Sequence, residues 1–286
     1  MAIYKRTYKN YTGAATKAGP RLFVLTRFGL IGVFKSKLLM LFMGACLIYP
    51  ICCIAFVYLS HNPKLLAAFN IPDGALPAVN GRFFYFYSIV QGALAYLLAA
   101  FIGPGLISPD VANGAMPLYF SRPLSRTKYV AGKLTVLLLL LSLITWVPGS
   151  AVFAVQASIA GWEWTKNNFW LEGAIVAGLV VWIFVLSLIA LALSAWVRWK
   201  IAAGALLLGV IFAGAGFGMA INSLMRTSSG SLIDLSQVVQ TIWSDLFRYD
   251  TGTEMSVASA WIVLAVACVV SWWLLARRIR PFEVIK

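Results

Sequence analysis

The sequence predicts an all-α integral membrane protein with six transmembrane helices. Of its 286 residues, 61% are hydrophobic and 11% are charged, and the mean hydropathy is +0.86, whereas soluble domains are only about 45–50% apolar. A helix needs about 20 apolar residues to cross a bilayer. Uncharged apolar runs of this kind occupy 38–60, 83–107, 134–160, 173–197, 201–221 and 256–276. These observations place the chain in a membrane.

The Lys and Arg residues predict that both termini are cytoplasmic. Cytoplasmic loops beside membrane spans accumulate positive charge. With the N-terminus inside, 18 of the 23 Lys and Arg residues lie in inner segments, and seven of the nine acids lie outside. Topology and anionic lipid headgroups account for this excess of positive charge, which is spread over four segments. The pattern therefore argues against nucleic acid as a partner.

The N-terminal segment 1–37 is basic and contains no acidic residue. Pro20 marks the start of "RLFVLTRFGLIGVFKSK", for which two interpretations stand. It is either an interfacial helix at the inner headgroups, with snorkelling Arg and Lys stems, or a basic leader that only sets topology. The first apolar run is too long and too late for a cleaved signal peptide, so we expect it to stay as an anchor.

Span 2 begins with "FFYFYS", an aromatic belt typical of a membrane boundary. It closes with "FIGPGLISPD". Pro104 has no N–H to donate, and the glycines on both sides of it are conformationally permissive. We therefore expect the helix to kink or end there.

The loop 108–133 gathers positive charge between spans 2 and 3. A short helix from about Val111 to Phe120, held by Pro109 and Pro123, would form a firm knob on the cytoplasmic face. The flanking cations would hold it against lipid headgroups or an acidic groove. Charge alone fits equally well an ordinary loop that only fixes topology.

Span 5 is rich in small residues at four-residue spacing. In lipid, small residues at that spacing allow two helix backbones to approach closely. The packing can lie within one subunit or between two subunits. The candidate positions for helix packing or a dimer contact are Ala205, Gly209, Gly214 and Gly218.

The external loop 222–255 contains an amphipathic stretch, "SLIDLSQVVQTIWSDLF", at 231–247. Apolar residues recur there at three- and four-residue steps, which is typical of an amphipathic helix. Ser231 with Asp234 resembles a capping-box start. The two aspartates make it a poor span, so we expect it to lie on or dip into the outer face. A covering helix and a gating helix are both consistent with the pattern.

The sequence shows no catalytic motif. It has one histidine, His61, no pair of residues spaced to hold a metal, and no phosphate-binding glycine motif. The four cysteines lie inside predicted spans, where they fit small apolar positions. No carboxylate lies within a predicted span, which counts against proton-coupled transport. We expect no catalytic residue, no bound metal and no enzyme activity of the chain's own.

The stretch "GLISPDVANGAMPLYFSRPLSRTKYVAGK" resembles the corresponding loop in membrane subunits of ABC transporters of the type-2 exporter family. In such permeases an acidic residue after span 2 is followed by a small-residue turn, a Pro with nearby basic residues, and a Gly-Lys that opens span 3. The matching positions here are Asp110, Asn113, Gly114, Pro123, Arg126, Gly132 and Lys133. The family more often has Glu in place of the acid and Thr in place of Ala115.

The resemblance implies a permease subunit of an ATP-driven exporter in a bacterial cytoplasmic (inner) membrane. The domain 38–276 would pair with a second permease copy, and 277–286 would be a basic cytoplasmic tail. Two separate ATP-binding subunits would carry ATP and Mg²⁺, with the 108–133 loop as the coupling element, and the chain itself would bind no cofactor. The resemblance also implies a pathway beside spans 2 and 5, with candidate lining groups, each also compatible with a packing role, at Tyr87, Gln91 and Asn222.

Two alternatives come from other functional classes. A membrane-embedded enzyme for lipid-linked substrates would need a cluster of carboxylates or histidines at one membrane face. The acids outside are scattered along the chain at Glu163, Glu172, Asp234, Asp245 and Asp250. A membrane scaffold that does not transport would need no such cluster.

Overall fold

The computed structural model describes residues 20–72, 75–120, 125–226 and 228–279. Over these residues the chain is helical, without strands. Six stretches are long and apolar enough to cross a membrane, which confirms the six predicted spans. They are Lys37–Ser60, Gly81–Ala112, Arg126–Ala160, Trp162–Trp196, Lys200–Met225 and Val257–Arg278.

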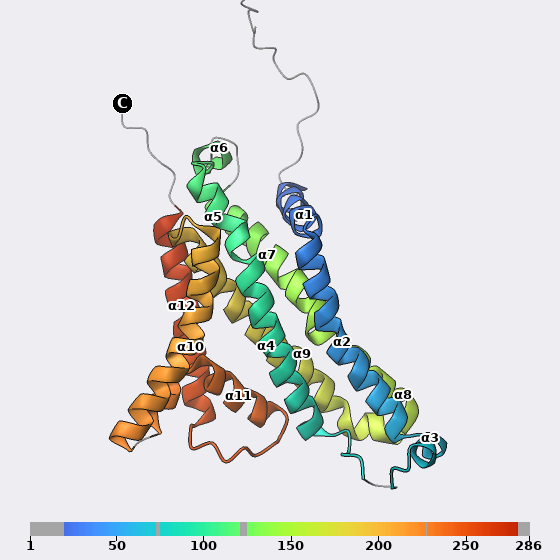
Figure 1. Cartoon of the computed structure of the whole chain (residues 1–286). Helices are drawn as coiled ribbons and strands as arrows, with labels where there is room; N and C mark the ends of the chain where they lie inside the picture. Colours follow the sequence, from blue (N-terminus) through green and yellow to red (C-terminus); the bar gives the residue numbers. More distant parts are fainter. Residues whose placement is uncertain (1–19, 73–74, 121–124, 227, 280–286) are drawn as a thin grey trace, which may run out of the picture.

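Some of these stretches consist of two helices, and shorter helices lie between them (Figure 1). The elements are α1 (Pro20–Phe34), α2 (Lys37–Ser60), α3 (Pro63–Ala68), α4 (Gly81–Ile102), α5 (Pro104–Ala112), α6 (Met116–Phe120), α7 (Arg126–Ile144), α8 (Trp146–Ala160), α9 (Trp162–Trp196), α10 (Lys200–Met225), the 3₁₀ turn η1 (Ser229–Leu232), α11 (Leu235–Leu246) and α12 (Val257–Arg278).

The long helix α9 forms the centre of the bundle. Its most apolar window is 72% buried, against 22% for α10 and 17% for α12. At 35 residues it is ~52 Å long, so it extends well beyond the predicted run 173–197. The extension places Glu172 inside a continuous helix. The predicted run 173–197 itself contains no carboxylate.

The expected interruption of span 2 is present. Helix α4 ends at Ile102 and α5 begins at Pro104. Between them, a Cβ added at Gly103 would lie 2.7 Å from the Cβ of Ala190 on α9. The residue at this joint must therefore be small.

Span 3 contains a break that the sequence pattern did not predict. Helix α7 ends at Ile144 and α8 begins at Trp146, because the backbone of Thr145 leaves the helical region with φ −109° and ψ −94°. Pro148 follows in the first turn of α8, where a missing N–H is tolerated. The predicted run 134–160 is thus two helices.

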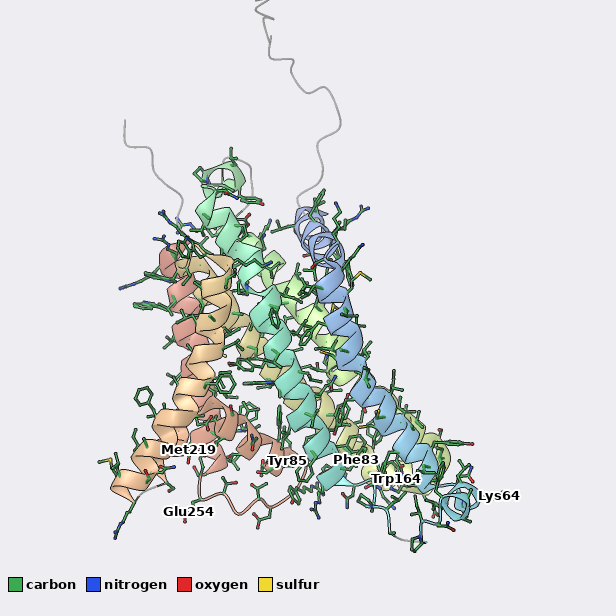
Figure 2. All side chains as sticks on the ribbon, in the orientation of Figure 1. Lys64, Phe83, Tyr85, Trp164, Met219 and Glu254 are labelled. Atoms are coloured by element: carbon green, nitrogen blue, oxygen red, sulfur yellow. The ribbon has the colours of Figure 1, made fainter. Side chains whose placement is uncertain are left out.

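The beginning of α1, the helix α6 and the end of α12 lie at one end of the bundle (Figure 1). The tip of α3 and the connection from α11 to α12 lie at the opposite end. Figure 2 shows Phe83 and Trp164 at that opposite end, together with Lys64. This placement agrees with an aromatic belt at one membrane boundary.

The amphipathic stretch forms α11, and its start differs from the prediction. Asp234 is the N-cap and accepts hydrogen bonds from the amides of Ser236 and Gln237, so the capping-box start at Ser231 is wrong. The helix buries its apolar face between α4, α9, α10 and α12, at Val238, Val239, Ile242 and Trp243. Helix α11 therefore lies among the bundle helices, and Asp234 caps its N-terminus.

Candidate functional site: the α5–α7 connection and the α4–α10 groove

An ion pair joins the two ends of the connection between spans 2 and 3. The Nζ of Lys133 on α7 lies 2.9 Å from Oδ2 of Asp110 on α5, and the two side chains are only 11% and 18% exposed. The hydroxyl of the buried Tyr129 donates to the same oxygen at 2.7 Å. One carboxylate thus receives a cation and a phenol, and charge-assisted contacts of this kind are the strong ones.

An aromatic contact extends this network to α6. The ring centroids of Tyr119 and Tyr129 are 5.2 Å apart. Burial raises the pKa of Tyr119, and the nearby carboxylate of Asp110 raises it further. The three helices α5, α6 and α7 are therefore held to one another.

The turn between α5 and α6 is where the chain reaches outward. Gly114 has φ +62° with open space around it, and Asn113 beside it is exposed. An L-residue other than Asn or Asp rarely adopts such a backbone. The expected single helix from Val111 to Phe120 is wrong, because the chain breaks at this turn into α5 and α6.

The remaining predicted coupling residues are divided between surface, packing and undescribed positions. Arg126 begins α7 and is exposed. Gly132 packs against α1, since a Cβ added there would lie 2.7 Å from the side chain of Leu25. Pro123 lies outside the described residues. The structure thus brings Asp110 and Lys133 together and leaves Asn113, Gly114 and Arg126 exposed.

A serine pair fixes α5 to the central helix. The amide of Ser108 donates to Oγ of Ser194 at 2.9 Å, and its hydroxyl donates to the carbonyl of Ser194 at 3.0 Å. The hydroxyl of Ser194 also donates to the carbonyl of Pro104 at 3.1 Å. Both serines are fully buried. Sequence reasoning missed this contact, because two serines in apolar stretches 86 residues apart carry no local signal.

A groove of about 270 Å³ opens between α4, α9, α10 and α11. It is mainly aromatic and apolar, with Gln240 and Ser236 as polar groups. At the end of the groove nearest α5, Tyr96 donates to the carbonyl of Leu208 on α10 at 2.7 Å. Helices α4 and α10 are therefore tied together toward the α5 end, while α11 lies between them toward the other end (Figure 1).

Two tryptophans form the wall of this groove. Trp182 of α9 donates its Nε1–H to the carbonyl of Gly92 at 3.0 Å. Trp243 of α11 donates to the carbonyl of Gly178 at 3.1 Å. The two rings meet edge to face with centroids 6.3 Å apart. Both indole groups are thus oriented by backbone acceptors in an otherwise apolar site.

The predicted lining residues of span 2 are buried inside the chain. Tyr87 and Gln91 are both 0% exposed. Tyr87 donates to the carbonyl of Thr145 at 3.1 Å, and Gln91 donates to the carbonyls of Cys46 and Ile144. The two side chains satisfy backbone groups of α2 and α7 and do not line the groove.

Asn222 also makes contacts within its own chain. Its Oδ1 accepts from the amide of Gly230 at 2.7 Å, and its Nδ2 donates to the hydroxyl of Ser231 at 3.0 Å. It therefore closes the turn between α10 and η1. The arrangement matches the packing role that the sequence left open for it.

The four small residues of α10 lie on two different faces. A Cβ added at Gly214 would lie 2.8 Å from the carbonyl oxygen of Ile233, and one at Gly218 would lie 2.7 Å from that of Gly230. These two glycines pack within the chain. Ala205 and Gly209, in contrast, are exposed, and they belong to an exposed row of small residues along α10 at Ala202, Ala205, Gly209, Ala213, Gly216 and Ala220.

One of the acids predicted to lie outside is paired within the bundle. The hydroxyl of Ser150 on α8 donates to Oε1 of Glu172 at 2.5 Å, and Oε2 of Glu172 is buried without a partner. Asp234 is the N-cap of α11. Across the described part of the chain, no group of three His, Cys, Asp or Glu side chains could hold a metal ion.

Comparison with known proteins adds no relative. No model of a known protein family matches the chain, and no curated protein matches it in sequence. The similarity to exporter permeases therefore stands on the residues of the α5–α7 connection and on the six-span layout.

Proposed function

We propose that this chain is the permease subunit of an ATP-driven ABC exporter, in which two copies form the pathway and two separate ATP-binding subunits supply the energy. The observation that carries the proposal is the pairing of Asp110 with Lys133 and Tyr129. It joins the exposed α5–α6 turn to both span 2 and span 3. A protein that pushes on this turn would therefore move two spans together.

A partner can drive such a change only if its contacts differ between two states of the membrane domain. The turn and the start of α7 offer a suitable contact surface, since Asn113 and Gly114 in the turn and Arg126 on α7 are exposed. The ion pair behind it transmits the displacement without facing the partner. In this proposal the 108–133 loop seats in a cleft of the ATP-binding subunit at the cytoplasmic face of the bacterial inner membrane.

The exposed row of small residues on α10 supports a contact with the second permease copy. In lipid, helices associate mainly through close packing and not through the hydrophobic effect. Ala205 and Gly209 lie in this row, and no atom lies within 4 Å of a Cβ added at Gly209. The groove between α4 and α10 lies on another side of the same helix, since Ile211, Phe212 and Ala215 line it and none of them belongs to this row.

The test is purification of the full-length tagged chain from its native membrane, followed by measurement of ATP hydrolysis in the complex. We expect a co-purified ATPase whose activity depends on the turn. Gly114→Trp and Arg126→Glu should reduce that activity while leaving the chain folded. The matched control is Gly252→Trp in the connection between α11 and α12, an exposed glycine with the same left-handed backbone (φ +65°) and open space around it. No ATPase partner, or activity equal in all variants, would rule out the coupling role.

A further inference from the structure

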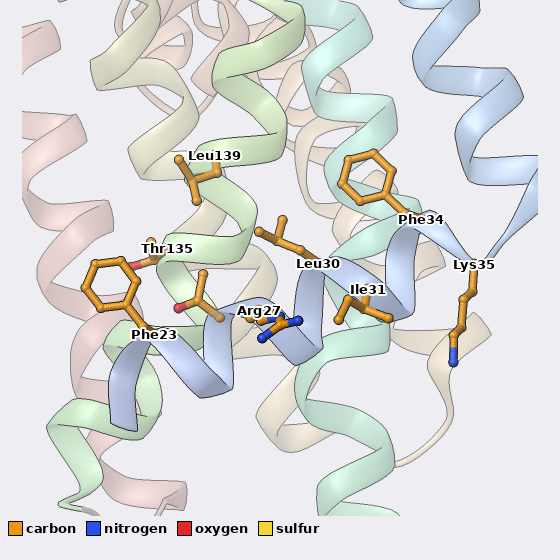
Figure 3. A pocket seen from close by; sticks show the side chains of 9 residues that line it. Phe23, Arg27, Leu30, Ile31, Phe34, Lys35, Thr135 and Leu139 are labelled. Carbon is orange, nitrogen blue, oxygen red and sulfur yellow. The ribbon is translucent and has the colours of Figure 1, made fainter. Parts of the chain in front are cut away.

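An apolar groove of about 560 Å³ lies between helix α1 and the spanning helix α7. Figure 3 shows Phe23 and Phe34 of α1 at its two ends and Leu139 of α7 between them. Phe23 is 76% exposed and Leu139 is 50% exposed. The protein itself therefore leaves the groove uncovered.

Close packing fixes the position of the groove. Helix α1 runs across the bundle helices, not along them (Figure 3). A Cβ added at Gly29 would lie 2.7 Å from the side chain of Val136 on α7. The hydroxyl of Thr26 on α1 donates to the carbonyl of Gly132 on α7 at 3.4 Å. The two helices are thus in direct contact beside the groove. Packing within the chain therefore fixes the position of the groove.

Two cations line the same groove. Arg27 and Lys35 are exposed, and Lys35 extends away from Leu139 in Figure 3. Neither has an acidic side chain within salt-bridge distance in the described ranges, and the first 37 residues contain no acid. Their charge is therefore available to a ligand that is anionic at one end.

We propose that this groove binds an anionic phospholipid of the leaflet at the α1 and α6 end of the bundle. The acyl chain lies against Leu30 and Leu139, and the phosphate lies within reach of Arg27 and Lys35. The argument is one of complementarity, since an apolar hollow on the side of a spanning helix, edged by unpaired cations, matches an apolar tail that ends in an anion. The proposal does not depend on the transport function.

Photo-crosslinking locates the lipid. The full-length protein carries benzoylphenylalanine at position 23, inside the groove, or at position 28, where Phe28 is 68% exposed but does not line it. Each variant is placed in phosphatidylcholine vesicles that contain phosphatidylglycerol, with the radiolabel on one lipid or the other. We expect position 23 to favour phosphatidylglycerol and position 28 to show no preference. Equal yields from both lipids at position 23 indicate ordinary boundary lipid and overturn the proposal.

Charge removal tests the role of the cations. Each basic residue near an anionic lipid surface strengthens binding about fivefold, so Arg27→Gln with Lys35→Gln should weaken phosphatidylglycerol binding about 25-fold. Binding is measured by native mass spectrometry of the detergent-solubilised protein, with phosphatidylcholine as the comparison lipid. Arg27→Lys with Lys35→Arg should retain it. Lys128→Gln, an exposed cation away from the groove, is the matched control, and an equal loss there would contradict the site.

Discussion

The side-chain amide of Gln91 donates to the carbonyl oxygen of Ile144, and this is the carbonyl that Pro148, four residues later, cannot satisfy because proline has no N–H. The same amide donates to the carbonyl of Cys46 at 3.0 Å, and Pro50 stands four residues after Cys46 inside α2. One buried amide has two N–H groups. It therefore supplies the hydrogen bond that one carbonyl in each of two spans lacks because a proline follows four residues later.

Replacing this amide should destabilise the fold. In Gln91→Leu two buried carbonyls lose their partner, and each unsatisfied buried group costs about 1–3 kcal/mol. We expect a lower free energy of unfolding in detergent, followed by tryptophan fluorescence. The cost should be larger than that of Gln237→Leu, at a half-buried position on α11 whose side chain makes no hydrogen bond among the described contacts.

A double-mutant cycle separates this explanation from loss of packing. Pro148→Ala restores an N–H four residues after Ile144, so the carbonyl gains a second possible donor. Gln91→Leu should then cost about 1 kcal/mol less in the Pro148→Ala background than in the native chain. Equal costs in the two backgrounds would show that the amide does not act through this carbonyl.

Breaking the ion pair of the α5–α7 connection should also destabilise the fold. Lys133→Met leaves the carboxylate of Asp110 with Tyr129 but without its cation, and removal of one partner from a buried pair costs about 3–5 kcal/mol. The measured quantity is again the free energy of unfolding. Adding Asp110→Asn should recover part of the loss, because the uncompensated charge is then removed as well. Lys128→Met, at an exposed site, should be nearly neutral.

Features with a local signal were predictable from the sequence. The spans follow from uncharged apolar runs, and the end of α4 at Ile102 follows from the Gly-Pro-Gly sequence after it. The amphipathic helix α11 follows from the three- and four-residue spacing of its apolar side chains. In each case neighbours in the sequence determine the outcome. Local periodicity and backbone chemistry were sufficient.

The unpredicted features depend on contacts distant in the sequence. Pro148 is compatible with an unbroken start of a helix, so nothing local indicates that α7 ends at Ile144. Gln91 is an ordinary polar residue in a span until α2 and α7 are placed on either side of it. The charge of Lys133 is also consistent with a loop residue that only sets membrane topology, yet its side chain is paired with Asp110, 23 positions earlier. Residue type alone could not distinguish a side chain that lines a pathway from one that packs inside the bundle.

The two faces of α10 predict opposite outcomes for one substitution. Gly214→Leu would place its side chain against the carbonyl oxygen of Ile233, 2.8 Å from the new Cβ, and should destabilise the single chain. Gly209→Leu points into open space and should leave unfolding unchanged while weakening association of two copies. Chemical crosslinking in vesicles and thermal unfolding in detergent distinguish these effects. A dimer unaffected by Gly209→Leu would place the contact on another helix.

The wall of the α4–α10 groove makes a final prediction. Trp243→Phe keeps an aromatic ring at a 3% exposed site but removes the donor that bonds the carbonyl of Gly178. The loss should be about 0.5–1.5 kcal/mol, the net contribution of one hydrogen bond, because the carbonyl of Gly178 keeps its intrahelical partner in α9. Since the bond ties α11 to α9, its loss should also increase amide hydrogen exchange across 235–246 more than elsewhere. Trp261→Phe, 41% exposed on α12, should change neither quantity. Uniform exchange in the Trp243 variant would mean that α11 is held by its apolar face alone.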